Sequence, residues 1–368
     1  MIRVNNIHLS LDYDDKSVRK AVAQQLRIEE KSIKSCKIFR RSVDARKKDN
    51  IYFLTTVDAE LNINEDKVCK KCGNAQIARK YEYNQMKFGN APSPIVVGAG
   101  PAGLFAALIL ARSGANPILI ERGRDVDRRT ADVNRFWTSG KLDITSNVQF
   151  GEGGAGTFSD GKLNSGTKDI RQRKVLEEFV SHGAPDEILY NAKPHIGTDM
   201  LKGTIKNIRN EIIELGGRVM FETKLVSMAF SDNKLKSITV ETANGDEIIE
   251  TDNVILAIGH SARDTFEMLY DLKLPIEAKP FSVGARIEHL RQKVDKAQYG
   301  RFAGNKKLGS ANYKLSTHLD NGRGVYTFCM CPGGKVVNAS SEKNRLCTNG
   351  MSEFARNADN SNSALLVG

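Results

Sequence analysis

The sequence opens without the long apolar segment of an export signal. Its first residues, Met1 to Asn6, are soon followed by three acids, Asp12, Asp14 and Asp15. A secretory signal needs an apolar stretch of roughly 7–15 residues, so we expect a cytoplasmic protein. The six cysteines of this 368-residue chain are therefore expected to be reduced thiols and not a disulfide framework.

An uninterrupted apolar segment of membrane length is also missing. The run from Pro94 to Ala111 approaches that length, but three glycines and Pro101 cluster at its beginning. Charged residues follow closely, so we expect no membrane span. Only one CxxC pair occurs, Cys69 and Cys72, and no second pair lies at zinc-ribbon spacing. A redox pair or half a metal site is compatible with it, but two unrelated thiols are favoured, and no metal site is expected.

Residues 94–123, PIVVGAGPAGLFAALILARSGANPILIERG, combine a strand, a glycine-rich turn, a helix and a second strand. Gly98 permits a sharp turn, Gly100 lets the main chain approach a pyrophosphate, and Gly103 lets helix and strand pack closely. The pyrophosphate then lies at the helix N-terminus, whose unpaired N–H groups and dipole favour negative charge. Glu121 ends the second strand and is placed to bind a ribose. These features, in this order, predict a dinucleotide site.

A second glycine-rich segment, residues 147–162, contains five glycines within eleven positions. Such a segment suits main chain that lies against a flat or charged ligand. We therefore expect a second cofactor contact in preference to a surface loop. Downstream, apolar residues at 3- and 4-residue spacing predict one helix, and turn residues separate four predicted strands. The helix is expected at 201–215 and the strands at 224–230, 235–242, 247–251 and 254–258.

Residues 1–90 are more basic than the rest of the chain. They carry 19 Lys and Arg against 12 Asp and Glu, in a chain of net charge +11. A basic segment can bind RNA or an acidic partner, but no stacking aromatic pattern accompanies the charge, so a solvated surface is favoured. The pattern predicts a small α+β module. Its expected elements are strands at 2–11, 33–40 and 51–57, a helix at 16–26, a charged turn at 40–48 and a linker at 89–94.

Five segments carry a family resemblance. They are the GAGPAG…Glu121 unit, the loop 151–162, the segment Gly259–Asp264, the segment 281–289 (FSVGARIEH) and the segment 328–334 (FCMCPGG). Together they resemble the FAD-binding flavoproteins of the glutathione-reductase-like superfamily. The similarity is greatest to the bacterial FAD-dependent dehydrogenase, or NAD(P)/FAD-dependent oxidoreductase, group. It covers most of residues 90–368, and residues 1–90 resemble the extra N-terminal module of that group.

The resemblance implies an FAD site and a role for each matching residue. The implied pyrophosphate contacts are Gly98, Gly100, Pro101, Ala102 and Gly103. Glu121 would bind the adenosine ribose, and Arg122 would lie near the adenine or the phosphates. Further implied contacts are Val226 to the adenine through its backbone, Ala257 and Gly259 beside the cofactor, and Gly153, Gly154 and Gly156 near the flavin ring or ribityl chain.

The resemblance also implies hydride transfer between a small-molecule substrate and flavin N5. No second GxGxxG unit is present, so the dedicated NAD(P)H domain of disulfide reductases is not expected, although NAD(P)H remains a candidate electron donor. Nor does a CxxxxC pair accompany the glycine-rich loop, which argues against the dithiol relay of those enzymes.

Few residues stand out for catalysis. The weak acid–base candidates are His260, His289 and Lys162, and ordinary local contacts are the favoured interpretation of each. Arg286 is a weak candidate for binding a substrate carboxylate. Cys329 and Cys331 are either reactive thiols near the substrate or small buried side chains, which is the commoner case.

The predicted fold class is α/β. We expect a glutathione-reductase-like FAD/NAD(P)-binding Rossmann domain with a parallel sheet and a β-meander, a small N-terminal α+β module and a partial substrate domain. The expected boundaries are 1–90, 91–262 and 263–368. Superfamily members normally return to the FAD domain with a further glycine-rich strand and helix. This chain ends at Gly368 without them, so the last domain is expected to be incomplete.

The predicted function is an FAD-dependent oxidoreductase that acts on an unidentified small molecule. Two alternatives stay open. The first is an FAD-dependent RNA-modifying protein, whose binding of RNA would be salt-dependent. It would use the basic residues Arg40, Arg41, Arg46, Lys47 and Lys48. The second is a protein that binds FAD without catalysis.

Overall fold

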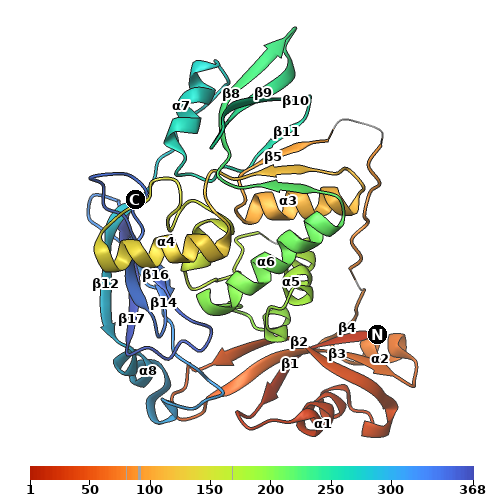
Figure 1. Ribbon diagram of the computed structural model, residues 1–368. Helices are drawn as coiled ribbons and strands as arrows, with labels where there is room; N and C mark the ends of the chain where they lie inside the picture. The colour runs from red at the N-terminus through yellow and green to blue at the C-terminus, as the bar shows by residue number, and fades with distance from the viewer. Residues whose placement is uncertain (80, 90–92, 168) are drawn as a thin grey trace.

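The N-terminal module is an antiparallel sheet covered by helices. The computed structural model describes residues 1–79, 81–89, 93–167 and 169–368 (Figure 1). The sheet has the strand order β2-β3-β1-β4. Alternate β1 residues, such as Ile2 and Val4, are buried against Val18 and Val22 of α1. The elements are β1 (Ile2–Leu9), α1 (Asp15–Leu26), β2 (Ile33–Asp44), β3 (Tyr52–Leu61), α2 (Glu65–Lys71) and β4 (Ala75–Ile77).

The central unit is a parallel sheet of the order β11-β5-β6-β7, with a three-stranded meander of the order β10-β9-β8. In Figure 1, α3 and α6 lie on one side of the parallel sheet and the meander rises beyond it with α7. The elements are β5 (Ile95–Val97), α3 (Pro101–Arg112), β6 (Ile118–Ile120), α4 (Val126–Ser139), the 3-10 turn η2 (Gly154–Phe158), α5 (Gln172–Ser181), α6 (Thr198–Glu214), β7 (Arg218–Met220), β8 (Lys224–Ser231), β9 (Lys234–Thr242), β10 (Gly245–Glu250), β11 (Val254–Leu256) and α7 (Arg263–Asp271).

Both faces of the central strands β5 and β6 are buried, which explains their uninterrupted apolar sequences. Side chains alternate between the two faces of a strand. Val96 and Leu119 accordingly pack with the helices α3 and α6. Ile95 and Ile120 pack with the meander and with Leu269 of α7. The carboxyl ends of these short strands are thereby fixed side by side.

The C-terminal part contains a sheet of the order β12-β17-β14-β13 and the hairpin β15-β16. Its residues Val294, Tyr299 and Met330 belong to the same apolar cluster as Ile2 and Val22, so this part and the N-terminal module share one core. Figure 1 shows α8 at the lower end of the last sheet, to the left of the N-terminal module. The elements are β12 (Val283–Leu290), α8 (Arg291–Tyr299), β13 (Ser316–His318), β14 (Gly324–Cys331), β15 (Lys335–Asn338), β16 (Thr348–Met351) and β17 (Asn360–Val367).

Most predicted elements are present with slightly shifted ends, and one prediction is wrong. The predicted helix at 201–215 is α6, and the four strands after it are β8 to β11. The charged turn at 40–48 was placed too early, because β2 continues to Asp44, where Val43 still pairs with Phe53. As the edge strand of its sheet, β2 tolerates charged residues that resemble a turn in the sequence. Residues 90–92 of the predicted linker lie outside the described residues.

Candidate cofactor site

A cavity of about 470 Å³ opens where β5, β6 and β11 end; we call it the cofactor cavity. Three segments form most of its wall: the glycine-rich turn after β5, the glycine-rich loop before η2, and the residues that follow β11. Ligands of open α/β sheets bind at the carboxyl ends of the strands. The cavity has the position and the volume of such a ligand site.

Glycine is required in the turn after β5 for two different reasons. Gly98 has a φ of +101°, and a Cβ there would lie 2.5 Å from the carbonyl oxygen of Ala257. A Cβ on Gly103 would lie 1.7 Å from the carbonyl oxygen of Gly98, so only glycine lets α3 approach the strand this closely. At Gly100 the nearest atom to such a Cβ is the Cα of Gly154, 4.0 Å away. Gly100 therefore borders open space.

The N-terminus of α3 faces this space. Its N-cap is Gly100, no side chain among the described residues caps it, and Pro101 stands at the first helical position. The first amides of a helix have no acceptor within the helix. Together with the helix dipole, these amides form a site that suits a phosphate group.

Glu121 is buried and connects three turns through its carboxylate. One oxygen accepts hydrogen bonds from the amides of Gly123 (2.9 Å) and Gly151 (3.0 Å), and the other from the amide of Ala99 (2.8 Å). A carboxylate has about four acceptor positions. One position therefore remains for a ligand hydroxyl, and Glu121 both lines the cavity and fixes its wall.

Arg122 lines the cofactor cavity between an aromatic ring and an acid. Its guanidinium lies 4.5 Å from the ring centroid of Phe150 and 2.9 Å from the carboxylate of Asp264. Lys224 binds the same carboxylate at 2.8 Å. Burial alone would raise the pKa of Asp264, but these two cations outweigh burial and lower it to about 2. Asp264 is thus an anion that orients Arg122.

A residue that the sequence did not single out, Arg129 of α4, organises the glycine-rich loop. Its side chain is fully buried and donates to main-chain carbonyls of the loop. The acceptors are the carbonyl oxygens of Asn147 (2.8 Å), Val148 (2.9 Å), Gly151 (3.3 Å), Glu152 (2.6 Å) and Gly154 (2.9 Å). Burial lowers the pKa of Arg129 to about 10, against the opposing charges of Glu121 and Glu152. Arg129 remains charged at neutral pH. Its guanidinium supplies the hydrogen bonds that the loop carbonyls would otherwise receive from main-chain amides in a helix or sheet.

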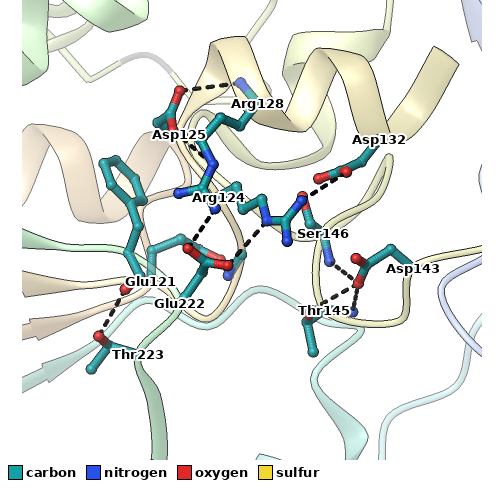
Figure 2. A network of polar contacts seen from close by, with 12 residues as sticks. Glu121, Arg124, Asp125, Arg128, Asp132, Asp143, Thr145, Ser146, Glu222 and Thr223 are labelled. Atoms are coloured by element: carbon teal, nitrogen blue, oxygen red, sulfur yellow. Dashed lines mark hydrogen bonds and ion pairs between the residues drawn. The ribbon is translucent and has the colours of Figure 1, made fainter. Parts of the chain in front are cut away.

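Around this loop, ion pairs join α4 to the turn after β7 (Figure 2). Arg124 binds Asp132 and Glu222 at 3.0 Å each, and Arg128 binds Glu222 at 2.7 Å.

Glu152 of the glycine-rich loop is also buried, and its carboxylate accepts a hydrogen bond from the amide of Val126 (2.7 Å). Burial raises the pKa of Glu152, and the hydrogen bond from Val126 opposes that effect.

The structure brings most of the predicted cofactor residues together. The cofactor cavity is lined by Gly98, Gly100, Pro101, Ala102, Glu121, Arg122, Gly154, Ala257 and Gly259. The predicted contacts Gly103, Gly153, Gly156 and Val226 are not part of its lining. Of these, Gly153 donates to the carbonyl of Ala99 (2.8 Å) and so joins the loop to the glycine-rich turn.

The weak candidates for catalysis and substrate binding do not lie together, and His260 is the one that lines the cofactor cavity. His260 lines the cofactor cavity and shares a 3.0 Å contact with the hydroxyl of Ser261. Lys162 does not line it and instead binds Asp160 at 2.7 Å. The ring of His289 lies against Tyr313, 5.5 Å between centroids. Arg286 donates to Asn362 (2.7 Å) in the C-terminal sheet.

Other sequence features have local roles. Cys69 lies on α2, and burial raises the pKa of its thiol. Within the described ranges, no three His, Cys, Asp or Glu side chains lie close enough to hold a metal ion. None of the helices described there has the length and apolar character needed to cross a bilayer.

Among the basic residues of the RNA hypothesis, two are engaged within the chain. Arg41 donates to Asn191 (2.8 Å), and Arg46 pairs with Asp44 at 2.5 Å. RNA binding stays a prediction.

Comparison with protein families agrees with this site. Residues 93–132 match an FAD binding domain, residues 280–368 match the C-terminal domain of FAD-dependent proteins, and residues 1–60 match a domain of unknown function. The first match contains the glycine-rich turn, α3 and Glu121. The fold is accordingly an α/β, Rossmann-like FAD-binding fold, and the chain is a flavoprotein of that class.

A relative that matches the whole of this chain shows the family. An uncharacterised protein of Clostridium beijerinckii is 48% identical over 372 residues, a match that covers all of this chain and 69% of the relative. The chain belongs to the family of that protein, within the FAD-dependent oxidoreductase superfamily.

Solved structures are much less similar. The glycerol-3-phosphate dehydrogenase of Bacillus halodurans, complexed with FAD, is 12% identical, with a TM-score of 0.35 over 76% of this chain and 48% of that one. A flavoprotein/dehydrogenase of Cytophaga hutchinsonii is 14% identical, with a TM-score of 0.36 over 75% and 55%. The chain thus spans about half the length of these proteins, and similarity at this level carries no information about substrate.

Proposed function

We propose that the chain is an FAD-dependent oxidoreductase of the glutathione-reductase-like type, which transfers a hydride between a small-molecule substrate and flavin N5. NAD(P)H is the proposed electron donor. The observation that carries the proposal is the convergence of three features on the cofactor cavity. They are the open side of Gly100, the uncapped N-terminus of α3, and the carboxylate of Glu121 with one acceptor position left.

The residues present fit FAD. The amides at the start of α3 would hold the pyrophosphate, and Glu121 would accept from the adenosine ribose. Arg122, which Asp264 orients, would contact the adenine or the phosphates. Gly154 and Ala155 line the cavity at the beginning of η2 and would lie against the flavin end.

When bound, FAD supplies the hydride-accepting atom, and the protein supplies binding, orientation and proton transfer. His260 is the imidazole among the residues that line the cofactor cavity. It is therefore the proposed acid–base residue, because an imidazole has one nitrogen that can donate a proton and one that can accept it.

The decisive variant is Gly100→Val. Gly100 has a φ of −71°, and a Cβ there has space, so the substitution leaves the backbone unstrained. The side chain would instead occupy the space of the pyrophosphate. We expect FAD affinity to fall at least about tenfold, or about 1.4 kcal/mol, with an unchanged circular dichroism spectrum. FAD absorbance of the purified protein, before and after reconstitution, measures this.

Gly203→Ala is the matched control, because Gly203 lies exposed in α6 with no atom near its Cβ position. It should retain FAD like the wild type. Equal occupancy in Gly100→Val and the wild type would refute the proposed site. Anaerobic mixing with NADH or NADPH tests the donor, and absorbance that neither reagent bleaches would exclude both.

A further inference from the structure

Two cysteines of β14, Cys329 and Cys331, lie together at a break in the sheet. The pairing of β14 with β17 shifts between Phe328 and Cys331, and Cys329 has a φ of +46°, in the left-handed region. In a regular strand, residues two apart have Cα atoms about 6.6 Å from each other, near the upper limit for a disulfide. A bulge changes the direction of side chains. Here the thiol of Cys331 lies 3.3 Å from the carbonyl oxygen of Cys329.

Cations surround this pair of thiols. Lys162 donates to the sulfur of Cys331 at 3.4 Å, and Arg286 donates to the carbonyl of Cys329 at 3.2 Å. Arg286 also binds Asn362, whose fully buried amide nitrogen has no partner among the described residues. A Cβ on Gly350 would lie 2.5 Å from Arg286 Nη1 and 2.7 Å from the Cys331 sulfur, so glycine lets these groups converge.

The two thiols differ in access. Cys331 is fully buried, whereas Cys329 is half-buried and lines a cavity of about 220 Å³, the thiol cavity. The cavity is also lined by four cations, and no carboxylate of the described residues is part of its lining. These cations are Lys162, Lys193, Lys314 and Arg356. The buried Asp160 pairs with two of these cations, Lys162 and Arg356, so the cations outnumber the acids beside the cavity. A ligand that reaches Cys329 therefore enters a positive field, which favours an anion.

The charge distribution favours a thiolate within the pair. The neighbouring Cys331 side chain lowers the pKa of the Cys329 thiol, burial opposes this effect, and the charges of Lys162 and Arg286 lower the pKa further. The neighbouring Cys329 side chain and burial raise the pKa of the Cys331 thiol. The two shifts have opposite directions, so Cys329 loses its proton more readily than Cys331. Thiolates are the reactive form of cysteine.

We propose that Cys329 and Cys331 form a redox-active dithiol that reduces small anionic disulfides, with Cys329 as the attacking thiol and Cys331 as the resolving thiol. This site is distinct from the CxxxxC relay that the sequence lacks. The exchange takes its electrons from the two thiols, so it stands independently of the proposed flavin reaction.

The steps balance as thiol–disulfide exchange. The Cys329 thiolate attacks one sulfur of RSSR, the S–S bond breaks, and RS⁻ leaves and takes up a proton. Cys331 then loses its proton and attacks the Cys329 sulfur of the mixed disulfide, which releases the second RS⁻, protonated in turn. Two protein thiols are oxidised to one disulfide, and RSSR is reduced to two RSH.

The test uses the full chain, reduced and freed of reductant, under anaerobic conditions. The probes are 3,3′-dithiodipropionate, an anionic disulfide, and cystamine, a cationic disulfide of similar size. Free thiols are then blocked with iodoacetamide, and trypsin releases residues 324–335, which contain Cys329, Cys331 and no other cysteine. We expect this peptide to be lighter by two hydrogen atoms and unalkylated, and the anionic probe to react about tenfold faster than the cationic one.

Variants separate the roles of the two thiols. With Cys331→Ser, the reaction should stop at a mixed disulfide between Cys329 and 3-mercaptopropionate. With Cys329→Ser, the probe should not react with this peptide. The exposed Cys347 provides the rate of an ordinary thiol in the same sample. The proposal is wrong if the wild-type peptide remains fully alkylated, or if it reacts more slowly than Cys347. Because that measurement is made on the wild type, misfolding of a variant cannot obscure the result.

Discussion

The cofactor cavity and the thiol cavity differ in the groups that form their walls. The first is formed largely by main chain, with glycines where a Cβ would collide and helix amides toward the ligand. The second is lined by four long cationic side chains and by Cys329. A main-chain wall fits a ligand closely, and the ionised side chains of the cofactor cavity include an acid, Glu121, as well as cations. The ionised side chains that line the thiol cavity are all cations, which provides electrostatic selection. The two cavities are therefore suited to different ligands.

The comparison has one exception, because the main-chain wall depends on a buried cation. Arg129 is fully buried and holds the glycine-rich loop through five carbonyl groups, whereas the four cations that line the thiol cavity are all at least partly exposed. The predictions below test how far each cavity depends on single charged side chains.

The largest effect is expected for Arg129→Met. The variant leaves several buried carbonyls without donors, at about 1–3 kcal/mol each before relaxation. We expect the free energy of unfolding to fall by at least about 3 kcal/mol, measured by urea denaturation with circular dichroism. FAD affinity should fall as well, because the loop loses its fixed shape.

Arg40→Met, at an exposed position of β2, is the control and should change the free energy of unfolding by less than about 0.5 kcal/mol. Equal urea midpoints for Arg129→Met and the wild type would show that the loop holds without this side chain.

A smaller effect is expected for Asp160→Asn beside the thiol cavity. Asp160 is buried and binds Arg356 (2.8 Å) and Lys162 (2.7 Å). Burial would raise the pKa of Asp160, but these two cations outweigh it and lower the pKa. A carboxyl with a lowered pKa stabilises the fold above its unfolded pKa, near 3.9, and this contribution is lost as the pH falls through the folded value.

We therefore expect Asp160→Asn to cost about 1.5–3 kcal/mol at neutral pH, with a difference from the wild type that shrinks below about pH 4. Urea unfolding between about pH 3 and pH 7 measures this difference. Asp12→Asn, at an exposed site, is the matched control. A difference that stays constant over this range would contradict the ion pairing.

The sequence predicts the part of the site that one short segment forms. Gly98, Gly103 and Glu121 follow from local spacing, because strand, turn and helix are consecutive and each has its own periodicity. Gly98 and Gly103 shape the main chain of this segment, and the Glu121 carboxylate binds amides within it and that of Gly151 beyond it. The predicted contacts Val226 and Gly156 came from resemblance alone, and neither lines the cavity.

What the sequence could not reveal depends on residues far apart in the chain. Arg129 binds carbonyl groups, which every residue possesses, so no motif marks its partners. Lys162 meets Cys331 across 169 positions, and periodicity carries no information about such pairs. Likewise, Met330 shares a core with Ile2 only because the two sheets pack together. One signal was available for the thiol pair, namely two cysteines two residues apart, but its cationic surroundings were not.

The smallest effect is expected for Glu152→Gln, with a pH dependence opposite to that of Asp160→Asn. Burial raises the pKa of Glu152, so the folded state binds more protons than the unfolded state just above the unfolded pKa. The free energy of unfolding then falls as the pH rises through that window. The amide keeps an acceptor for Val126 and Arg209, which bind Glu152 at 2.7 and 3.0 Å, so the variant should differ from the wild type by within about 1 kcal/mol. Urea unfolding from about pH 4 to pH 8 measures this effect: the free energy of unfolding of Glu152→Gln should rise relative to that of the wild type as the pH rises. The control Glu214→Gln, at the exposed end of α6, should show the same pH dependence as the wild type. If the free energy of unfolding of Glu152→Gln falls relative to the wild type as the pH rises, the main-chain wall depends on an ionised Glu152, as the thiol cavity depends on an ionised Asp160. The contrast between the two cavities would then fail.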